Sequence, residues 1–301
     1  MERFNVKGNV MVLITTMIWG AAFVAQRSGM EHVDPFTFLA VRFFIGGCVT
    51  MAAAPLFARM AKTRQSFTDL FSKGTIKAGM CCGAALFIAA SLQQSGMQYT
   101  TAGKGGFLTT LYVIFVPIIG LFLRKKPRVW VWFGMALAVA GTYFLSVNEG
   151  FTINQGDLLI LCCALFFAFH ILIIDRFAGS HDGIAMSSVQ FFTVSVFAGV
   201  FMVLFETPRV SDIIACTIPL LYTGLLSSGV AYTLQIKVQK ITAPSVAAIL
   251  LSMESVFAAL AGYLFIAEIL TARELLGCAL VLAAVITAQI PGKKHREISN
   301  R

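Results

Sequence analysis

The chain has 301 residues, of which 58% are hydrophobic and only 12% are charged, and its mean hydropathy is +0.83. A soluble domain has about half apolar and about a quarter charged residues, so this composition excludes a soluble globular protein and predicts an integral membrane protein in a lipid bilayer. The formal net charge of +9 comes from short basic clusters between apolar runs. That arrangement fits membrane topology signals better than a nucleic-acid surface, and we expect no nucleic-acid partner.

Ten apolar segments follow one another along the chain, separated by charge clusters, Gly/Pro breaks and polar turns. Each has about 18–23 residues, the length that a helix needs to cross about 30 Å of hydrocarbon, whereas a barrel strand would be about half as long. The sequence therefore predicts an all-α integral membrane protein with ten transmembrane helices, at residues 10–28, 36–57, 76–97, 104–123, 129–147, 156–176, 186–205, 215–236, 244–266 and 274–291.

The basic residues predict how these helices are oriented. With a cytoplasmic N-terminus, 18 of the 23 lysines and arginines fall on the cytoplasmic side. Four fall on the outer side and one, Arg42, lies within a segment; the four are Arg27, Lys104, Arg209 and Arg273. Since lysine and arginine are enriched in cytoplasmic loops, we expect a multi-pass protein of the plasma (inner) membrane with both termini in the cytoplasm.

The two halves of the chain show internal similarity. A shift of 142 residues places Phe115 on Phe257 and Tyr112 on Glu254. It also places the basic loop at 124–126, expected on the inner side, on the acidic loop at 266–268, expected on the outer side. An inverted second copy brings the matching loop to the opposite side of the membrane, where basic residues are not favoured. Inverted repeats are typical of secondary transporters, whose site lies between the halves near the midplane. We therefore predict two five-helix repeats, at residues 1–150 and, inverted, at residues 151–301.

Several stretches resemble the drug/metabolite transporter superfamily, in particular its EamA-type ten-helix members. They are Trp19-Gly20-Ala21-Ala22-Phe23, Arg42, the passage from Tyr99 to Pro117, Ile241-Thr242-Ala243-Pro244, and the stretch from Glu254 to Thr271. The resemblance covers essentially the whole chain and implies a bundle around a central cavity, transport of small metabolites, often export, and a scaffold role for the fifth and tenth helices. The chain departs from the family pattern at two positions. Ser255 replaces the proline that often follows the glutamate of the ninth helix. The glutamate that often ends the fourth helix is missing, and Arg124 stands in that region.

Glu254 is the most informative single residue, because a charge near the bilayer centre costs about 3 kcal/mol on insertion scales. The bulky residues of 244–266, among them Ile249, Leu250 and Leu264, share one helix face, and the small residues share the other. Small residues let membrane helices approach closely, so we expect the bulky face to look toward lipid and the small face toward protein. Glu254 falls at the edge of the small face, so we expect it to point into the bundle. Three roles remain open for it: a hydrogen bond between helices, contact with substrate or a gate, and coupling to a proton.

The other candidate residues for the cavity each carry an alternative. Arg42 either attracts an anionic group of the substrate or reaches to the outer headgroups, and Lys104 either enters the cavity or stays among headgroups. His170 is a packing residue, a cavity residue or a proton carrier. The remaining polar-tipped residues within the segments either contact substrate or belong to packing and interface belts; they are Trp19, Gln93, Tyr112, Tyr232 and Gln235.

The sequence contains no metalloprotease motif, nucleophile elbow or nucleotide loop, and its seven cysteines lack zinc-type spacing with histidines. We expect no enzyme activity, no catalytic residues, no cofactor and no metal site. The prediction is a secondary transporter, an exporter, of small organic metabolites such as amino acids or drug-like compounds by alternating access, with a proton as a possible coupling ion. The alternative is a membrane-embedded lipid-handling protein or enzyme without transport activity.

Overall fold

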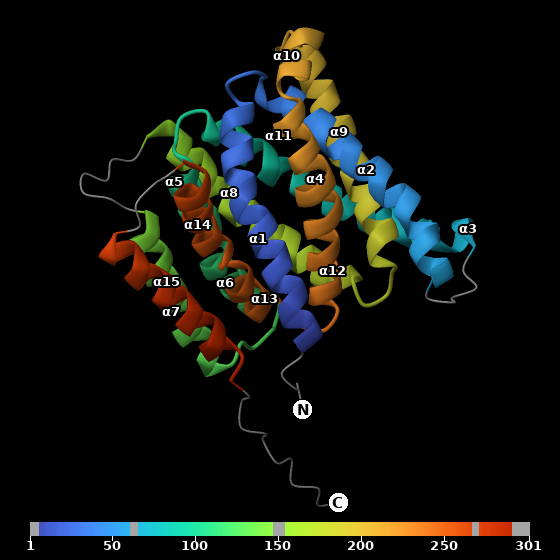
Figure 1. Ribbon diagram of the computed structural model, residues 1–301. Coiled ribbons are helices and arrows are strands. Elements are labelled where there is room, and N and C mark those ends of the chain that lie inside the picture. The colour runs from blue at the N-terminus through green and yellow to red at the C-terminus, as the bar shows by residue number, and fades with distance from the viewer. Residues whose placement is uncertain (1–5, 61–65, 147–153, 267–270, 291–301) are drawn as a thin grey trace, which may run out of the picture.

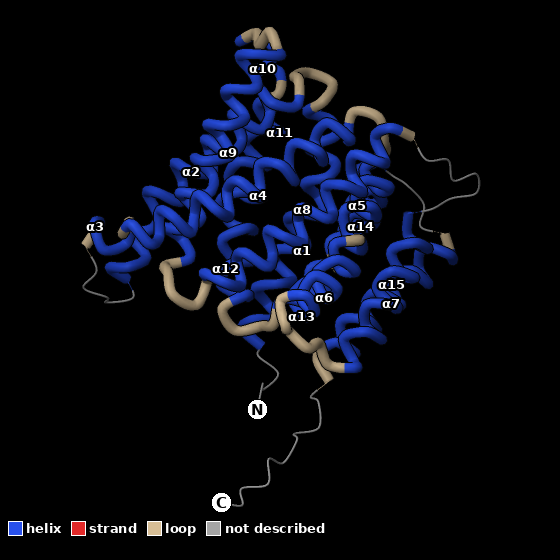
Figure 2. Tube along the Cα trace, turned by 180° about the vertical axis from the view of Figure 1, so that it is seen from behind, coloured by secondary structure: helices blue, strands red, loops and turns tan. Residues whose placement is uncertain are grey.

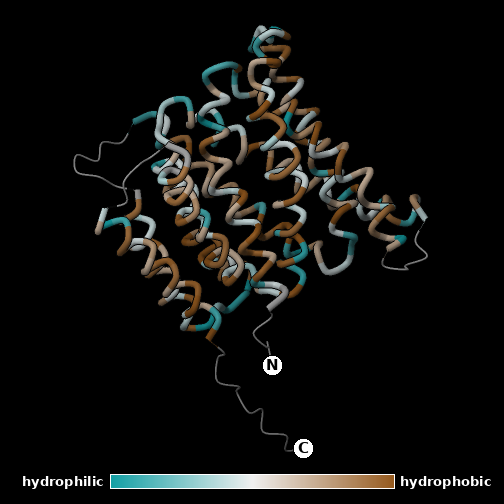
Figure 3. The backbone as a smooth tube through the Cα atoms, in the orientation of Figure 1, coloured by the Kyte–Doolittle hydropathy of each residue, from teal (hydrophilic) through white to brown (hydrophobic). Residues whose placement is uncertain are grey.

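The computed structural model describes residues 6–60, 66–146, 154–266 and 271–290, and within these ranges the chain forms helices and no strand. The helices gather in one bundle (Figure 1). Hydrophobic residues cover the flanks of the bundle, whereas hydrophilic residues concentrate toward its two ends (Figure 3). This distribution is the one that a bilayer imposes, because apolar flanks face hydrocarbon and the ends face water.

The first half of the chain contains seven helices: α1 (Val6–Gly29), α2 (Pro35–Met60), α3 (Phe67–Leu70), α4 (Lys73–Met97), α5 (Ala102–Thr110), α6 (Tyr112–Phe122) and α7 (Val129–Ser146). The second half contains α8 (Gln155–Phe177), α9 (Gly183–Phe205), α10 (Val210–Ala215), α11 (Thr217–Leu221), the π-helix η1 (Tyr222–Tyr232), α12 (Thr233–Gln239), α13 (Pro244–Leu251), α14 (Glu254–Ile266) and α15 (Ala272–Ala288).

Seven segments of the described chain are long and apolar enough to cross a membrane: Gly8–Gly29, Pro35–Met60, Lys73–Met97, Ala102–Phe122, Gln155–Phe177, Gly183–Phe205 and Pro244–Ala261. A shorter apolar helix covers Val129–Leu145. The chain is thus an all-helical, multi-pass membrane protein. Every segment expected from the sequence overlaps a helix or a series of helices.

Small residues bring neighbouring helices into close contact. A side-chain carbon added at Gly141 of α7 would lie 2.8 Å from the Gly277 carbonyl oxygen of α15, and one added at Gly277 would lie 2.7 Å from the Gly141 oxygen. Because these glycines have no side chain, the two backbones touch. α7 and α15 lie side by side at one edge of the bundle in both views (Figures 1 and 2).

Two of the expected continuous helices are interrupted. The segment from 102 to 122 breaks at Leu111, between α5 and α6, and the segment from 244 to 266 breaks at Ser252 and Met253, between α13 and α14. At both breaks some hydrogen bonds close over three residues instead of four, as from the Leu111 N–H to the Leu108 oxygen and from the Met253 N–H to the Leu250 oxygen. The breaks lie inside the bundle, where irregular backbone is tolerated in a membrane protein.

The break changes which side chains of 244–266 face lipid. The bulky residue Leu264 near the end of α14 is exposed, but Ile249 and Leu250 of α13 are buried. α13 packs against α6, α7 and α15, so the expectation of one lipid-facing bulky face fails in its first half. The expected repeat boundary near 150, residues 267–268 of the expected acidic outer loop and both chain ends lie outside the described residues.

Candidate functional site

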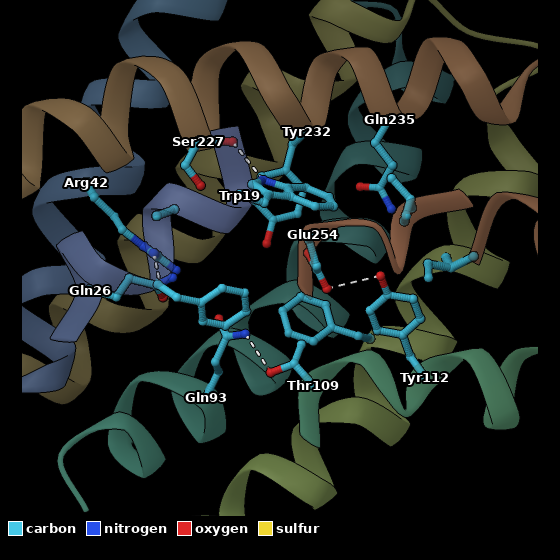
Figure 4. Close-up of a pocket in the computed structure, with 15 residues that line it drawn as sticks. Trp19, Gln26, Arg42, Gln93, Thr109, Tyr112, Ser227, Tyr232, Gln235 and Glu254 are labelled. Carbon is cyan, nitrogen blue, oxygen red and sulfur yellow. Dashed lines mark hydrogen bonds between the residues drawn. The ribbon is translucent and has the colours of Figure 1, made fainter. Parts of the chain in front are cut away.

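A cavity lies inside the bundle between the two halves of the chain, and polar and aromatic side chains line it (Figure 4). The lining residues come from helices α1, α2, α4, α5, α6, α8, η1, α12, α13 and α14. They are Trp19, Ala22, Phe23, Gln26, Arg42, Gln93, Thr109, Tyr112, Phe167, Ile171, Ser227, Tyr232, Gln235, Leu251 and Glu254.

The cavity is narrow. Its space free of protein atoms is about 490 Å³, but the centres of water-sized molecules can occupy only about 40 Å³ of it. One water needs about 10–15 Å³ by this measure, so the cavity holds a few waters. A metabolite-sized ligand therefore requires the surrounding helices to move apart.

Glu254 and Tyr112 lie next to each other in the cavity lining (Figure 4). Each is the first residue after a helix break, Tyr112 at the start of α6 and Glu254 at the start of α14. The Tyr112 hydroxyl donates a hydrogen bond of 3.1 Å to Glu254 Oε1, and the hydroxyls of Thr110 and Ser255 lie 2.9 Å apart next to the same breaks. Glu254 is 4% exposed. The two residues that a 142-residue shift superimposes in the sequence thus touch each other in space.

Arg42 occupies another part of the cavity and is 2% exposed. Its Nη1 donates to Gln26 Oε1 at 3.1 Å, and its Cζ lies 4.6 Å from the centre of the Phe43 ring. Its Nε has no hydrogen-bond partner among the described residues. An aromatic face attracts a guanidinium group but satisfies no N–H donor, so Arg42 keeps donor capacity inside the protein.

Aromatic rings surround Tyr232 on the side of η1. The Trp19 ring meets it edge-on at 4.8 Å, and the rings of Phe191 and His170 both lie at 5.9 Å. The Trp19 indole N–H donates to the Ser227 carbonyl at 3.3 Å. π-Helical turns are frequent at functional sites; here η1 contributes Ser227 and Tyr232 to the cavity lining.

Seven of the nine candidate residues from the sequence line this one cavity: Trp19, Arg42, Gln93, Tyr112, Tyr232, Gln235 and Glu254. Gln93, on α4, donates to the Thr109 hydroxyl at 3.1 Å. The Oε1 of Gln235 is buried without a partner in the described structure.

Lys104 and His170 lie elsewhere. Lys104 reaches Asp157 at the start of α8, where Nζ and Oδ2 are 2.5 Å apart, so it joins α5 to α8 outside the cavity lining. His170 is fully buried behind Tyr232, and its Nε2 lies 3.2 Å from Gln190 Oε1. The sequence could not separate these positions from the cavity because both are polar residues in apolar helices.

Three polar lining residues were not among the candidates: Gln26, Thr109 and Ser227. A signal for Gln26 exists in the sequence, because it lies seven residues after Trp19 and so shares its helix face. Thr109 and Ser227 carry no comparable signal, since threonine and serine are common in membrane helices and bond their own backbone.

The lining offers one cationic side chain, Arg42, and one carboxyl side chain, Glu254, together with neutral amides, hydroxyls and aromatic rings. Within the described residues no group of three or more His, Cys, Asp or Glu could hold a metal ion. The arrangement suits reversible binding of a small polar or charged molecule.

Comparisons with known proteins agree with this fold. The sequence profile of the EamA-like transporter family matches residues 6–147 and 154–288. A protein of Archaeoglobus fulgidus named "Uncharacterized transporter" is 34% identical over 281 residues, which cover 92% of this chain and 84% of the relative. "Uncharacterized transporter YoaV" of Bacillus subtilis is 27% identical over 288 residues, covering 93% and 96%. A solved crystal structure superimposes with a TM-score of 0.74 at 18% identity, covering 94% of this chain and 96% of that one.

Proposed function

Because the chain belongs to the EamA-like transporter family, we propose that it is a secondary transporter that exports small organic metabolites, such as amino acids or drug-like compounds, by alternating access. The observation that carries this proposal is the buried cavity at the junction of two helix breaks, where Tyr112 and Glu254 meet. Placing a carboxyl group inside a membrane protein costs free energy. Binding of a transported solute to Glu254 would explain why the chain carries a carboxyl group there.

The proposed architecture is ten transmembrane helices in two inverted five-helix repeats, at residues 1–150 and 151–301, with both termini in the cytoplasm. Tyr112 and Glu254, which the 142-residue shift superimposes, contact each other in space. This contact supports the proposed inverted repeats, since residues close to a two-fold axis meet their symmetry-related counterparts. The family profile also matches twice, on either side of residues 148–153. Figure 1 supports the placement of the termini, because α1 begins and α15 ends at the same end of the bundle.

Movement at the two breaks would open the cavity. A helix interruption bends more readily than a continuous helix, since fewer backbone hydrogen bonds fix it. The bond between Tyr112 and Glu254 joins both breaks, so solute that competes for Glu254 would change how the halves contact each other. The α7–α15 pair stays outside the lining and is the proposed scaffold.

Glu254 is also the candidate for coupling to a proton. Substrate-driven proton movement in vesicles would be compared between the wild-type chain and Glu254→Gln. If the variant transports fully with unchanged coupling, Glu254 does not carry the proton.

Counterflow tests the function itself. The purified full chain is reconstituted in liposomes that are preloaded with one metabolite of a broad panel, and uptake of the labelled compound is followed. We expect accumulation for at least one small metabolite, with a loss of about tenfold or more in Glu254→Gln. No accumulation of any compound by a well-folded wild-type protein would contradict a transport function and favour the lipid-handling alternative.

A further inference from the structure

The Arg42 guanidinium has no anionic partner in the described part of the chain. The side chain is 2% exposed, and none of the described carboxylates forms an ion pair with it. Its hydrogen bond goes to a neutral acceptor, Gln26 Oε1, and its Nε is buried without any partner. Buried charges in proteins are normally paired, and a charge inside a membrane protein costs free energy. An anion from outside the chain would supply the missing partner.

The aromatic neighbours of Arg42 do not replace that partner. Its Cζ lies 4.6 Å from the centre of the Phe43 ring and 5.6 Å from the centre of the Phe38 ring. Such rings attract the face of the planar group, but they accept no hydrogen bond in its plane. The five N–H donors of a guanidinium lie in that plane, where a carboxylate can accept two of them at once.

Gln26 adds neutral donors beside Arg42. Arg42 only donates, so the Gln26 atom that accepts from it is the amide oxygen, and the amide nitrogen is the other end of the same group. The Gln26 backbone oxygen accepts from Gln94 Nε2 at 3.3 Å. Within the described residues, both bonds use Gln26 as an acceptor, and its amide N–H groups donate to no protein atom. Figure 4 shows the Arg42 and Gln26 side chains pointing toward each other.

Backbone packing positions both residues. A side-chain carbon added at Gly224 of η1 would lie 3.0 Å from the Arg42 backbone oxygen and 2.8 Å from Ile45 Cβ, so α2 and η1 touch at the level of Arg42. The bond from Gln94 holds the Gln26 backbone against α4. Groups carried by packed helices keep their geometry better than groups on loops, so these donors are in place before a ligand arrives.

The size and charge of the cavity favour one kind of anion. The space for water centres, about 40 Å³, corresponds to about three waters at about 10–15 Å³ each. A carboxylate group, with one carbon and two oxygens, takes about that room, and the remainder of a larger solute requires the helices to move apart. A phosphate group is larger and carries a charge of about −1.5 to −2, whereas Arg42 is the one cationic side chain of the lining.

We propose that Arg42 and the Gln26 amide form a subsite for a carboxylate group, so that the transported solutes are small carboxylates. The inference rests on the proposed function, because it names the chemical group of the solute that the same cavity binds. It makes Arg42 and Gln26 specificity-determining residues. Glu254, which accepts from Tyr112, takes no part in this subsite.

The test is binding of labelled acetate to the purified full chain in nanodiscs, with unlabelled acetate, acetamide, phosphate and chloride as competitors. Acetamide has the shape of acetate without its charge. We expect acetate to displace the label at a concentration about tenfold or more below that of acetamide, and below that of phosphate. Equal displacement by acetamide or by phosphate would overturn the proposal. Chloride displacing the label as well as acetate would also overturn it, because the site would then hold a free inorganic anion.

Variants assign the binding to Arg42. In Arg42→Gln, acetate should bind about tenfold or more weakly than in the wild-type chain and no better than acetamide. The matched control is Arg176→Gln, which removes the same charge from an exposed position and should leave acetate binding unchanged. If Arg42→Gln changes acetate binding no more than Arg176→Gln does, the proposal fails.

Two further comparisons keep the result decisive. Arg42→Lys keeps the charge but loses the planar fork, so acetate should bind it more weakly than the wild-type chain and still more tightly than acetamide. The wild-type competition decides the proposal even if Arg42→Gln does not fold. If counterflow shows transport of a metabolite but acetate does not bind, this inference fails and the proposed function stands. If no compound is transported, the proposed function fails, and the acetate competition then decides the subsite by itself.

Discussion

The two broken helices, α5–α6 and α13–α14, meet at the cavity but are held in different ways. α5–α6 is tied to α8 at both ends by ion pairs, Lys104 with Asp157 and Lys125 with Asp175. α13–α14 contacts α1 through its backbone at Gly20. One segment is thus positioned by charges at its ends and the other by close packing along its length, so the two should respond to different kinds of substitution.

The largest effect is expected from Gly20→Val, which tests the packing side of the comparison. Any side chain at Gly20 meets the backbone of Phe257 and Ala258, which cannot rotate away, so the unfolding free energy should fall by about 3 kcal/mol or more. Thermal unfolding in detergent measures it. Gly199→Val is the control, since nothing lies within 4 Å of a carbon added at Gly199 of α9; equal losses in both variants would contradict the packing account.

Glu254→Gln should have the next largest effect, on transport. It removes the carboxylate but keeps the shape, so we expect uptake of a transported substrate to fall about 10- to 100-fold while the melting temperature stays within a few degrees. Uptake into proteoliposomes and thermal unfolding are measured on the same preparation. A variant that loses stability but transports normally would assign Glu254 a structural role.

Tyr112→Phe removes the hydrogen bond from the other broken helix and should cost about tenfold in transport, because one bond to a charged acceptor is worth about 1.5 kcal/mol. The double variant Tyr112→Phe with Glu254→Gln should transport about as poorly as Glu254→Gln alone, since either change removes the hydrogen bond to a carboxylate, and the neutral bond that glutamine can still accept is the weaker one. Fully additive losses would show that the two residues act independently.

The two ion pairs at the ends of α5–α6 should differ in how much they contribute to the free energy of unfolding. Lys104→Gln leaves Asp157, which is 2% exposed, without its cation and should destabilise the protein by about 1–3 kcal/mol. Lys125→Gln affects a pair whose partners are 39% and 20% exposed and should cost less than about 1 kcal/mol. Unfolding at low and high salt measures both, and high salt should erase the smaller effect; equal, salt-independent losses would contradict the distinction.

Hydropathy and basic residues were sufficient to predict an all-helical membrane protein, because segment length and burial in lipid depend on simple transfer energies. They could not reveal the breaks at Leu111 and Met253. Both lie in apolar stretches without proline at the break, so the interruption depends on tertiary packing of the two halves. The π-helix at Tyr222–Tyr232 was missed for the same reason.

The sequence predicted those residues of the candidate site whose charged side chains cost free energy to place in a membrane. Arg42 and Glu254 stand out in the sequence for that reason, and the structure places both in one cavity. Lys104 also stands out, but its cost is offset by Asp157, a partner 53 residues away that no local pattern indicates. Gln26 and Ser227 enter the site through the folding of α1 and η1 against other helices.

The most direct test of the central claim asks whether the cavity opens to both sides of the membrane in turn. Ser227 lines it, so Ser227→Cys is introduced into a chain whose seven native cysteines are replaced, and an impermeant thiol reagent is applied to each face of oriented vesicles. We expect labelling from both faces, slowed by a transported substrate. Labelling from one face alone, or from neither, would contradict alternating access through this cavity.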